Sequence, residues 1–113
     1  MNINFQIHYR AEYGQSLCVI EIQESILGWT EKSPLVLNCQ GTDFWQVNVP
    51  ISDFAGSIRY KYAIRVGEGQ YIYEAGEPRI LNLVESQKSK VERQIVVRDA
   101  WQASTYEDSF YTT

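Results

Sequence analysis

The chain has 113 residues, a formal net charge of −4 and a hydrophobic content of 44%. This length fits one domain with one core, and the acidic balance argues against nucleic acids and anionic membrane surfaces as partners. No apolar stretch approaches the length of a membrane span, and the first residues do not resemble a signal peptide. We therefore expect neither a membrane segment nor secretion.

Apolar and polar residues alternate along most of the chain, a period that predicts strands rather than helices. Turn signals that contain glycine, some of them with aspartate or proline, separate the alternating runs. The predicted strands cover residues 3–9, 16–22, 35–37, 44–49, 58–66, 71–73, 80–83 and 94–97. Seven or eight short antiparallel strands at this spacing indicate an all-β fold, an immunoglobulin-like β-sandwich.

Two cysteines, Cys18 and Cys39, lie within apolar, strand-like runs. We therefore expect both to be buried free thiols in a reducing compartment, and a disulfide between neighbouring strands is the open alternative.

The sequence contains no group of residues typical of an active site. Its single histidine, His8, lies on the polar side of the first predicted strand, and no cysteine or histidine spacing suits zinc. Neither a G-x-S-x-G motif nor a phosphate-binding glycine loop is present. A catalytic carboxylate pair is the alternative that the many acidic residues leave open. We expect no catalysis by this fragment, no metal and no cofactor.

Several aromatic residues lie near predicted turns or follow the last strand: Tyr13, Trp29, Trp45, Tyr73 and Trp101. Large rings usually belong to the core, so one interpretation is that they cover the ends of the sandwich. The other is that they stay exposed and stack on the apolar face of glucose, while neighbouring polar groups bind its hydroxyls.

The order of these residues resembles carbohydrate-binding module family 20, the starch-binding domain, over roughly residues 3 to 102. The matching landmarks are Tyr13-Gly14, Leu27-Gly28-Trp29, Phe44-Trp45, Tyr60-Lys61-Tyr62, Tyr73-Glu74 and Asp99-Ala100-Trp101. The chain departs from the family pattern in three places, one of which is Tyr73 where the family usually has a second tryptophan. The spacer residue before Trp29 is missing, and Gly76-Glu77-Pro78 replaces the usual Asp-Pro-Asn turn.

The resemblance implies two starch-binding sites, each built from aromatic rings and polar side chains. Site one consists of Trp29, Lys61, Tyr73 and Glu74. Site two consists of Tyr13 and Trp45, with Asn38 or Asp43 as the polar edge. The implied partner is an α-1,4-glucan such as starch, glycogen or maltodextrin.

The sequence from Val96 to Thr113, together with Tyr73 to Gly76, is further similar to the N-terminal modules of plant-type disproportionating enzymes. These are cytoplasmic 4-alpha-glucanotransferases that carry tandem family 20 modules before a glycoside hydrolase family 77 barrel. The resemblance implies a glucan-binding module over residues 1–102 and a linker over 103–113. It also implies, in the same chain, a second family 20 module and a catalytic domain outside these residues.

Two alternatives remain open at this point. The sandwich could serve as a protein-interaction or spacer domain without sugar binding. It could also be a starch-binding domain attached to a phosphatase or another regulator of glycogen metabolism.

Overall fold

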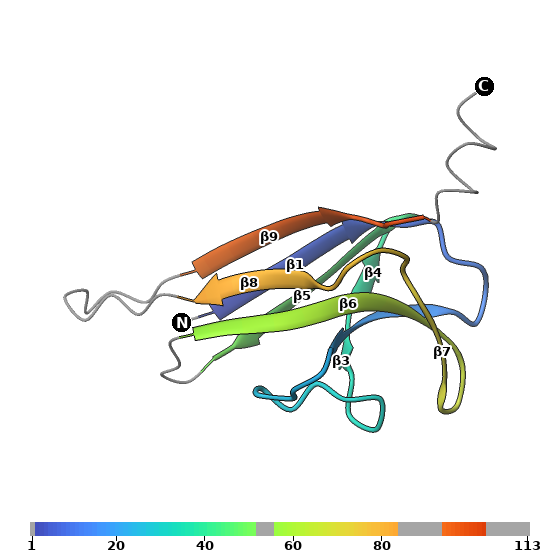
Figure 1. The fold of residues 1–113 in the computed structure, drawn as a ribbon. Helices are drawn as coiled ribbons and strands as arrows, with labels where there is room; N and C mark the ends of the chain where they lie inside the picture. The colour runs from blue at the N-terminus through green and yellow to red at the C-terminus, as the bar shows by residue number, and fades with distance from the viewer. Residues whose placement is uncertain (1, 52–55, 84–93, 104–113) are drawn as a thin grey trace.

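The computed structural model describes residues 2–51, 56–83 and 94–103, which form two packed β-sheets (Figure 1). These residues contain nine strands and no helix. The predicted all-β, immunoglobulin-like sandwich is confirmed, with an additional short strand, β4 (Asn38–Gln40), beyond those expected. The polar stretch 85–92, expected to be a loop or hairpin, and residues 104–113 of the predicted linker lie outside the described residues.

The first sheet has the order β4-β5-β1-β9. Its central strand, β1 (Asn2–His8), pairs antiparallel with β5 (Phe44–Pro50) and parallel with β9 (Gln94–Ala100). Because side chains alternate along a strand, Ile3, Phe5 and Ile7 face the second sheet and are fully buried. The polar residues between them lie on the outer side of this sheet.

The second sheet has the order β3-β2-β6-β7, with β8 also paired to β6. It comprises β2 (Ser16–Glu21), β3 (Leu35–Val36), β6 (Gly56–Gly67), β7 (Gln70–Tyr73) and β8 (Arg79–Leu83). β6 is 12 residues long, which lets one of its edges pair with β8 near its start and with β7 near its end. The turn between β7 and β8 therefore lies against the middle of β6.

The core lies between the sheets and contains alternate residues of both. From the second sheet, Leu17, Val19, Ile58, Tyr60, Tyr62 and Ile64 contribute to it. The outer side of this sheet carries a smaller buried cluster of Cys18, Ile20 and Ala63, against which Tyr71 and Tyr73 pack. The outer face of the second sheet is therefore partly apolar and carries two aromatic rings.

The two cysteines differ in environment. Cys18 is buried and Cys39 is exposed at the edge strand β4, and both are free thiols. The prediction that both are buried is therefore wrong for Cys39, because an edge strand of three residues covers little of its side chain. Burial raises the pKa of the Cys18 thiol to about 12.

The described residues contain no helix long and apolar enough to cross a membrane. Within the same ranges, no three histidine, cysteine, aspartate or glutamate side chains gather in a group that could hold a metal ion.

Candidate functional site

The loop that follows β2 is organised by the carboxylate of Glu21, which is buried on the inner side of the strand. Its oxygens accept hydrogen bonds from the backbone N–H groups of Ile26 (2.8 Å), Leu27 (2.9 Å) and Trp29 (3.1 Å). The backbone N–H of Glu21 in turn donates to the carbonyl of Trp29 (2.8 Å). Charge-assisted bonds of this kind are stronger than neutral ones, so Glu21 fixes the path of the loop.

This path directs Trp29 into the core. Gly28 has a φ of 88°, a left-handed conformation that glycine adopts without steric cost and that reverses the chain before the tryptophan. The Trp29 side chain is 7% exposed, and its ring packs edge-on against Phe5 with centroids 5.6 Å apart. The expectation that Trp29 is held out to meet a sugar is therefore wrong, since the residue belongs to the buried core cluster.

Glu74 also differs from its predicted place. It directly follows Tyr73, and consecutive residues of an extended chain point to opposite sides. Tyr73 lies on the outer face of the second sheet, whereas Glu74 is 1% exposed and points inward. The two residues therefore cannot share one surface site.

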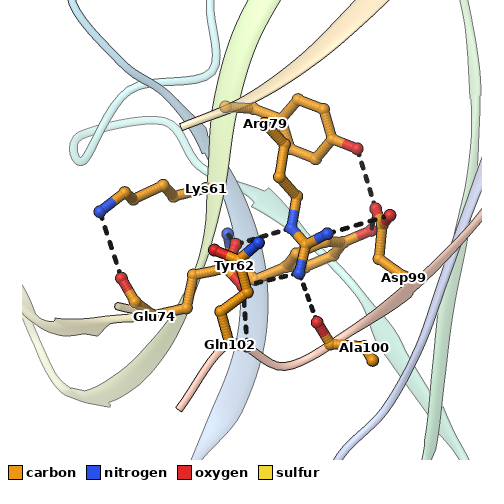
Figure 2. A network of polar contacts seen from close by, with 8 residues as sticks. Lys61, Tyr62, Glu74, Arg79, Asp99, Ala100 and Gln102 are labelled. Carbon is orange, nitrogen blue, oxygen red and sulfur yellow. Dashed lines mark hydrogen bonds and ion pairs between the residues drawn. The ribbon is translucent and has the colours of Figure 1, made fainter. Parts of the chain in front are cut away.

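The inward Glu74 carboxylate belongs to a polar cluster that joins the two sheets (Figure 2). It accepts hydrogen bonds from the backbone N–H of Tyr62 (2.9 Å) on β6 and from the N–H of Gln102 (3.1 Å), which follows β9. It also forms an ion pair with Arg79 (2.9 Å). Glu74 thus connects β6, the start of β8 and the end of β9.

Arg79 extends the cluster to Asp99 on β9, with which it forms a second ion pair at 3.3 Å. Asp99 also accepts hydrogen bonds from the hydroxyls of Tyr60 (2.8 Å) and Tyr62 (2.7 Å). Burial and the Asp99 carboxylate raise the pKa of both tyrosines above their ordinary range. Burial lowers the pKa of Arg79, but Glu74 and Asp99 outweigh it, so the guanidinium stays charged. These ion pairs and hydrogen bonds join the two sheets, so the cluster has a structural role.

Lys61 and Tyr73, the two other residues predicted for site one, do share a face. In the register, Ile20 opposes Lys61, Cys18 opposes Ala63, and Ala63 opposes Tyr73. Directly opposed residues of antiparallel strands project to the same side. Lys61 and Tyr73 therefore lie on the outer side of the second sheet, and Tyr71 joins them two residues before Tyr73. We call the surface made by Lys61, Tyr71 and Tyr73 the tyrosine face.

The tyrosine face is held in place by hydrogen bonds at its edges. The Tyr71 hydroxyl donates to the Glu31 carbonyl (2.7 Å), and the Tyr73 hydroxyl donates to the Glu31 carboxylate. Burial and this carboxylate raise the pKa of Tyr73, so its hydroxyl stays protonated. On the opposite edge, the Lys61 ammonium donates to the carbonyl of Glu74 (3.2 Å), as Figure 2 shows. An ammonium carries three donors, so Lys61 can bind further acceptors.

A groove of about 490 Å³ lies beside the tyrosine face. Tyr73 and Ile20 form one wall, and residues 23–32 of the Glu21-fixed loop supply the polar side chains of the other. Thr30, Glu31 and Lys32 offer a hydroxyl, a carboxylate and an ammonium there. An aromatic and apolar wall facing convergent polar groups is typical of small-molecule sites, whose volumes are about 300–1,000 Å³.

The residues predicted for site two do not assemble into an aromatic platform. Tyr13 is fully exposed in the turn between β1 and β2. Trp45 is 7% exposed, opposes Ile7 on the inner side of the first sheet, and donates its indole N–H to the Tyr9 carbonyl (2.9 Å). The interpretation of Trp45 as a core residue is therefore correct. Asn38 and Asp43 are exposed at the edge of this sheet.

Three residues that shape the tyrosine face were not predicted: Glu21, Glu31 and Tyr71. Glu21 stands at an inward position after Leu17 and Val19, so an acidic residue on an apolar strand face was its signal. Tyr71 lies two residues from Tyr73 in a predicted strand, and the period of two places both rings on one side. Glu31 carried no signal, because a loop residue has no predictable direction.

Comparisons with known proteins agree with this architecture. The family model described as "Starch binding domain" matches residues 1–93. Among solved structures, a glycoside hydrolase family 15 glucoamylase from Hypocrea jecorina has 17% identity and a TM-score of 0.71, over 91% of this chain and 17% of that one. A Hormoconis resinae glucoamylase has 22% identity and a TM-score of 0.65, over 93% of this chain and 18% of that one.

A third structure, the family 20 module of a maltotetraose-forming amylase from Pseudomonas saccharophila STB07, has 13% identity and a TM-score of 0.61. The match covers 100% of that module and 88% of this chain. Identities this low show the fold alone. The chain spans less than a fifth of either glucoamylase, at 17% and 18%. A search of curated proteins finds no match.

Proposed function

The chain belongs to the starch-binding domain family, as predicted, and from this premise we propose that it binds α-glucan on the tyrosine face. Modules of this family bind glucans and do not catalyse reactions, so the fragment acts by holding a polymer. The observation that carries the proposal is that Lys61, Tyr71 and Tyr73 share one accessible face beside a groove. Trp29, Trp45 and Glu74, by contrast, are enclosed.

Recognition on this face combines stacking with hydroxyl binding. The faces of the Tyr71 and Tyr73 rings are apolar and carry partial negative charge, and they suit the C–H groups on one face of glucose. Lys61 donates to ring hydroxyls, and the carboxylate of Glu31 accepts from them. Glu31 also holds both tyrosines in position, so no ring has to be ordered when the sugar binds.

Binding to a short maltodextrin should be weak. Each sugar hydroxyl exchanges a bond to water for a bond to protein, so its net gain is small. We expect a dissociation constant of roughly 0.1 mM or weaker, or about 5.5 kcal/mol of binding free energy. A second module in the same chain would raise the affinity for polymer by about a hundredfold through effective concentration.

Affinity electrophoresis through gels containing glycogen tests the proposal. Wild type and the His8→Ala variant, which loses an exposed ring on the opposite sheet, should be retarded equally. Tyr73→Ala should weaken binding by about 1–3 kcal/mol, by analogy with rings that stack on bases. Lys61→Ala should lose less, near one charge-assisted bond. Unretarded wild type would refute sugar binding and favour an interaction or spacer domain.

We further propose that the parent protein is a cytoplasmic 4-alpha-glucanotransferase with a second family 20 module and a family 77 catalytic domain. The similarity of the stretch from Val96 to Thr113, together with Tyr73 to Gly76, to the N-terminal modules of such enzymes supports this assignment. The full-length protein should convert maltoheptaose to longer and shorter glucans, whereas the 113-residue chain should form no new oligosaccharide. A parent that only dephosphorylates glucan would refute the assignment and leave the binding proposal intact.

A further inference from the structure

β9 forms one border of the first sheet, beside β1 (Figure 1). Border strands carry unpaired N–H and C=O groups, so natural proteins keep them short or protect them with bulges, lysine or proline. The other border strands that the structure describes, β3, β4, β7 and β8, have only two to five residues. β9 has seven, pairs with β1 without a register shift and contains neither lysine nor proline. It is therefore the described border best suited to pairing with another strand.

The backbone groups at the open edge of β9 belong to its even-numbered residues. Directly after β1, the N–H of Tyr9 donates to the carbonyl of Asp43, which precedes β5 (2.8 Å). By alternation, the even-numbered residues of β1 bond to β9, and in a parallel pair they bond to the β9 residues that flank their partners, here the odd-numbered ones. The carbonyl of Ala100 accordingly points away from β1 and accepts a hydrogen bond from Arg79 of the other sheet.

The side chains of β9 complement those of a second, antiparallel β9. In a register centred on Val96, which is 46% exposed, this valine faces Val96 of the second copy. Ile95 then faces Val97 on the inner side, where both are partly buried against the core. On the outer side, Gln94 faces Arg98, whose guanidinium donates through Nε to Gln6 (3.3 Å) and has further N–H donors for the amide oxygen. Apolar residues thus meet apolar residues, and a donor meets an acceptor.

From these features we propose that two copies of the chain associate through β9, so that their first sheets join into one across a twofold axis. The same residues supply both halves of the contact, which is the defining property of a twofold interface. Although each chain has a net charge of −4, this edge is not acidic, since Arg98 is its one exposed charge and Asp99 is paired with Arg79. The association does not depend on the proposed function. The tyrosine face lies on the other sheet, so a dimer would present two such faces to one glucan polymer.

Sedimentation between about 10 μM and about 1 mM tests the proposal, because mass action raises the dimer fraction over such a range. The apparent mass of wild type should rise toward that of two chains. Val96→Lys places two ammonium groups opposite each other across the axis, so the dissociation constant of the dimer should increase about tenfold. Val36→Lys, the matched control, changes a valine that is 40% exposed on the border strand β3 and should associate like wild type. Wild type that stays monomeric, or equal weakening by both variants, would overturn the proposal.

A disulfide tests the register independently of the lysine variants. Residues that face each other in a hydrogen-bonded antiparallel pair have Cα atoms about 5.5 Å apart, which a disulfide can span. In a Cys39→Ser background, which removes the exposed thiol, mild oxidation of Val96→Cys should give a covalent dimer with the circular dichroism spectrum of wild type. Val36→Cys in the same background should remain monomeric. Failure of Val96→Cys to cross-link, or equal cross-linking of both variants, would overturn pairing through β9.

Discussion

Trp29 and Tyr73 are the two rings that the family resemblance assigns to one sugar site, yet the fold places them on opposite sides of the second sheet. Tyr73 is part of a strand, so its direction follows from alternation. Trp29 is part of a loop, so its direction depends on the N–H groups that Glu21 collects. A buried carboxylate can thus turn a loop inward and make it part of the core.

The largest effect should come from removing the enclosed ring. Trp29→Ala empties the space beside Phe5, and deletion of a buried aromatic ring costs about 3–5 kcal/mol. Urea denaturation followed by circular dichroism measures the loss. A Trp29→Ala protein of wild-type stability that no longer binds glycogen would instead show that the ring lies outside the core and contacts the sugar.

A smaller loss is expected from Glu21→Gln, which keeps the shape of the side chain. The amide NH₂ cannot accept the hydrogen bonds that a carboxylate oxygen accepts, so the backbone N–H of Ile26 or of Trp29 loses its partner, at a cost of about 1–3 kcal/mol. Because residues 23–32 also form the groove wall, retention by glycogen should weaken too. Glu24→Gln, an exposed change in the same loop, should alter neither quantity.

Alkaline pH should destabilise the fold through groups on both sides of the second sheet. Cys18 lies beneath the outer tyrosines, and its folded pKa of about 12 exceeds its ordinary value of 9.0. Above pH 9.0 the unfolded chain loses this proton while the folded chain keeps it. Stability should therefore fall by at most about 1.4 kcal/mol per pH unit from this group.

Tyr60 and Tyr62 on the inner side and Tyr73 on the outer side should add to the slope above about pH 10, since their pKa values are also raised in the folded state. Urea titrations from pH 7 to 11 in steps of about 0.5 measure the slope. Cys18→Ala should flatten the part below about pH 10 and leave the tyrosine part unchanged. A slope that is identical in both proteins would contradict the assignment to Cys18.

The smallest effect should come from Tyr73→Phe. This change keeps the stacking ring and removes only the bond to Glu31, so affinity for glycogen should drop by about 0.5–1.5 kcal/mol at most, less than for Tyr73→Ala. Affinity electrophoresis measures the difference. Equal losses in Tyr73→Phe and Tyr73→Ala would show that the hydroxyl, not the ring face, carries recognition.

Strand alternation made the sandwich predictable. The grouping of Lys61 with Tyr73 came from the family resemblance, and the register of β6 with β7 places both on one face. Alternation also predicts that the side chains of Tyr73 and Glu74 point to opposite sides, although the family pattern groups the two residues in one site. Trp45 shows the same lesson, since its place in an alternating run outweighed its match to a landmark.

The direction of Trp29 was beyond prediction from the sequence. It depends on three N–H groups converging on one carboxylate, and no local pattern encodes such convergence. The exposure of Cys39 was missed for a related reason, because an apolar run does not reveal that its strand lies at a sheet edge. The cluster around Arg79 could not be predicted either, because it forms only when β8 pairs in the second sheet and β9 pairs in the first.

The parallel pairing of β1 with β9 sets the order in which the molecule can be completed during synthesis. Gln6 and Arg98, neighbours in the first sheet, are 92 positions apart in the chain. Contacts this distant form late and slow folding. Until Asp99 has left the ribosome, Arg79 and the two inner tyrosines lack the acceptor that joins the sheets. Until then, the two layers of the nascent chain are incompletely joined, and the edge of β1 that β9 later covers stays open to association with other strands.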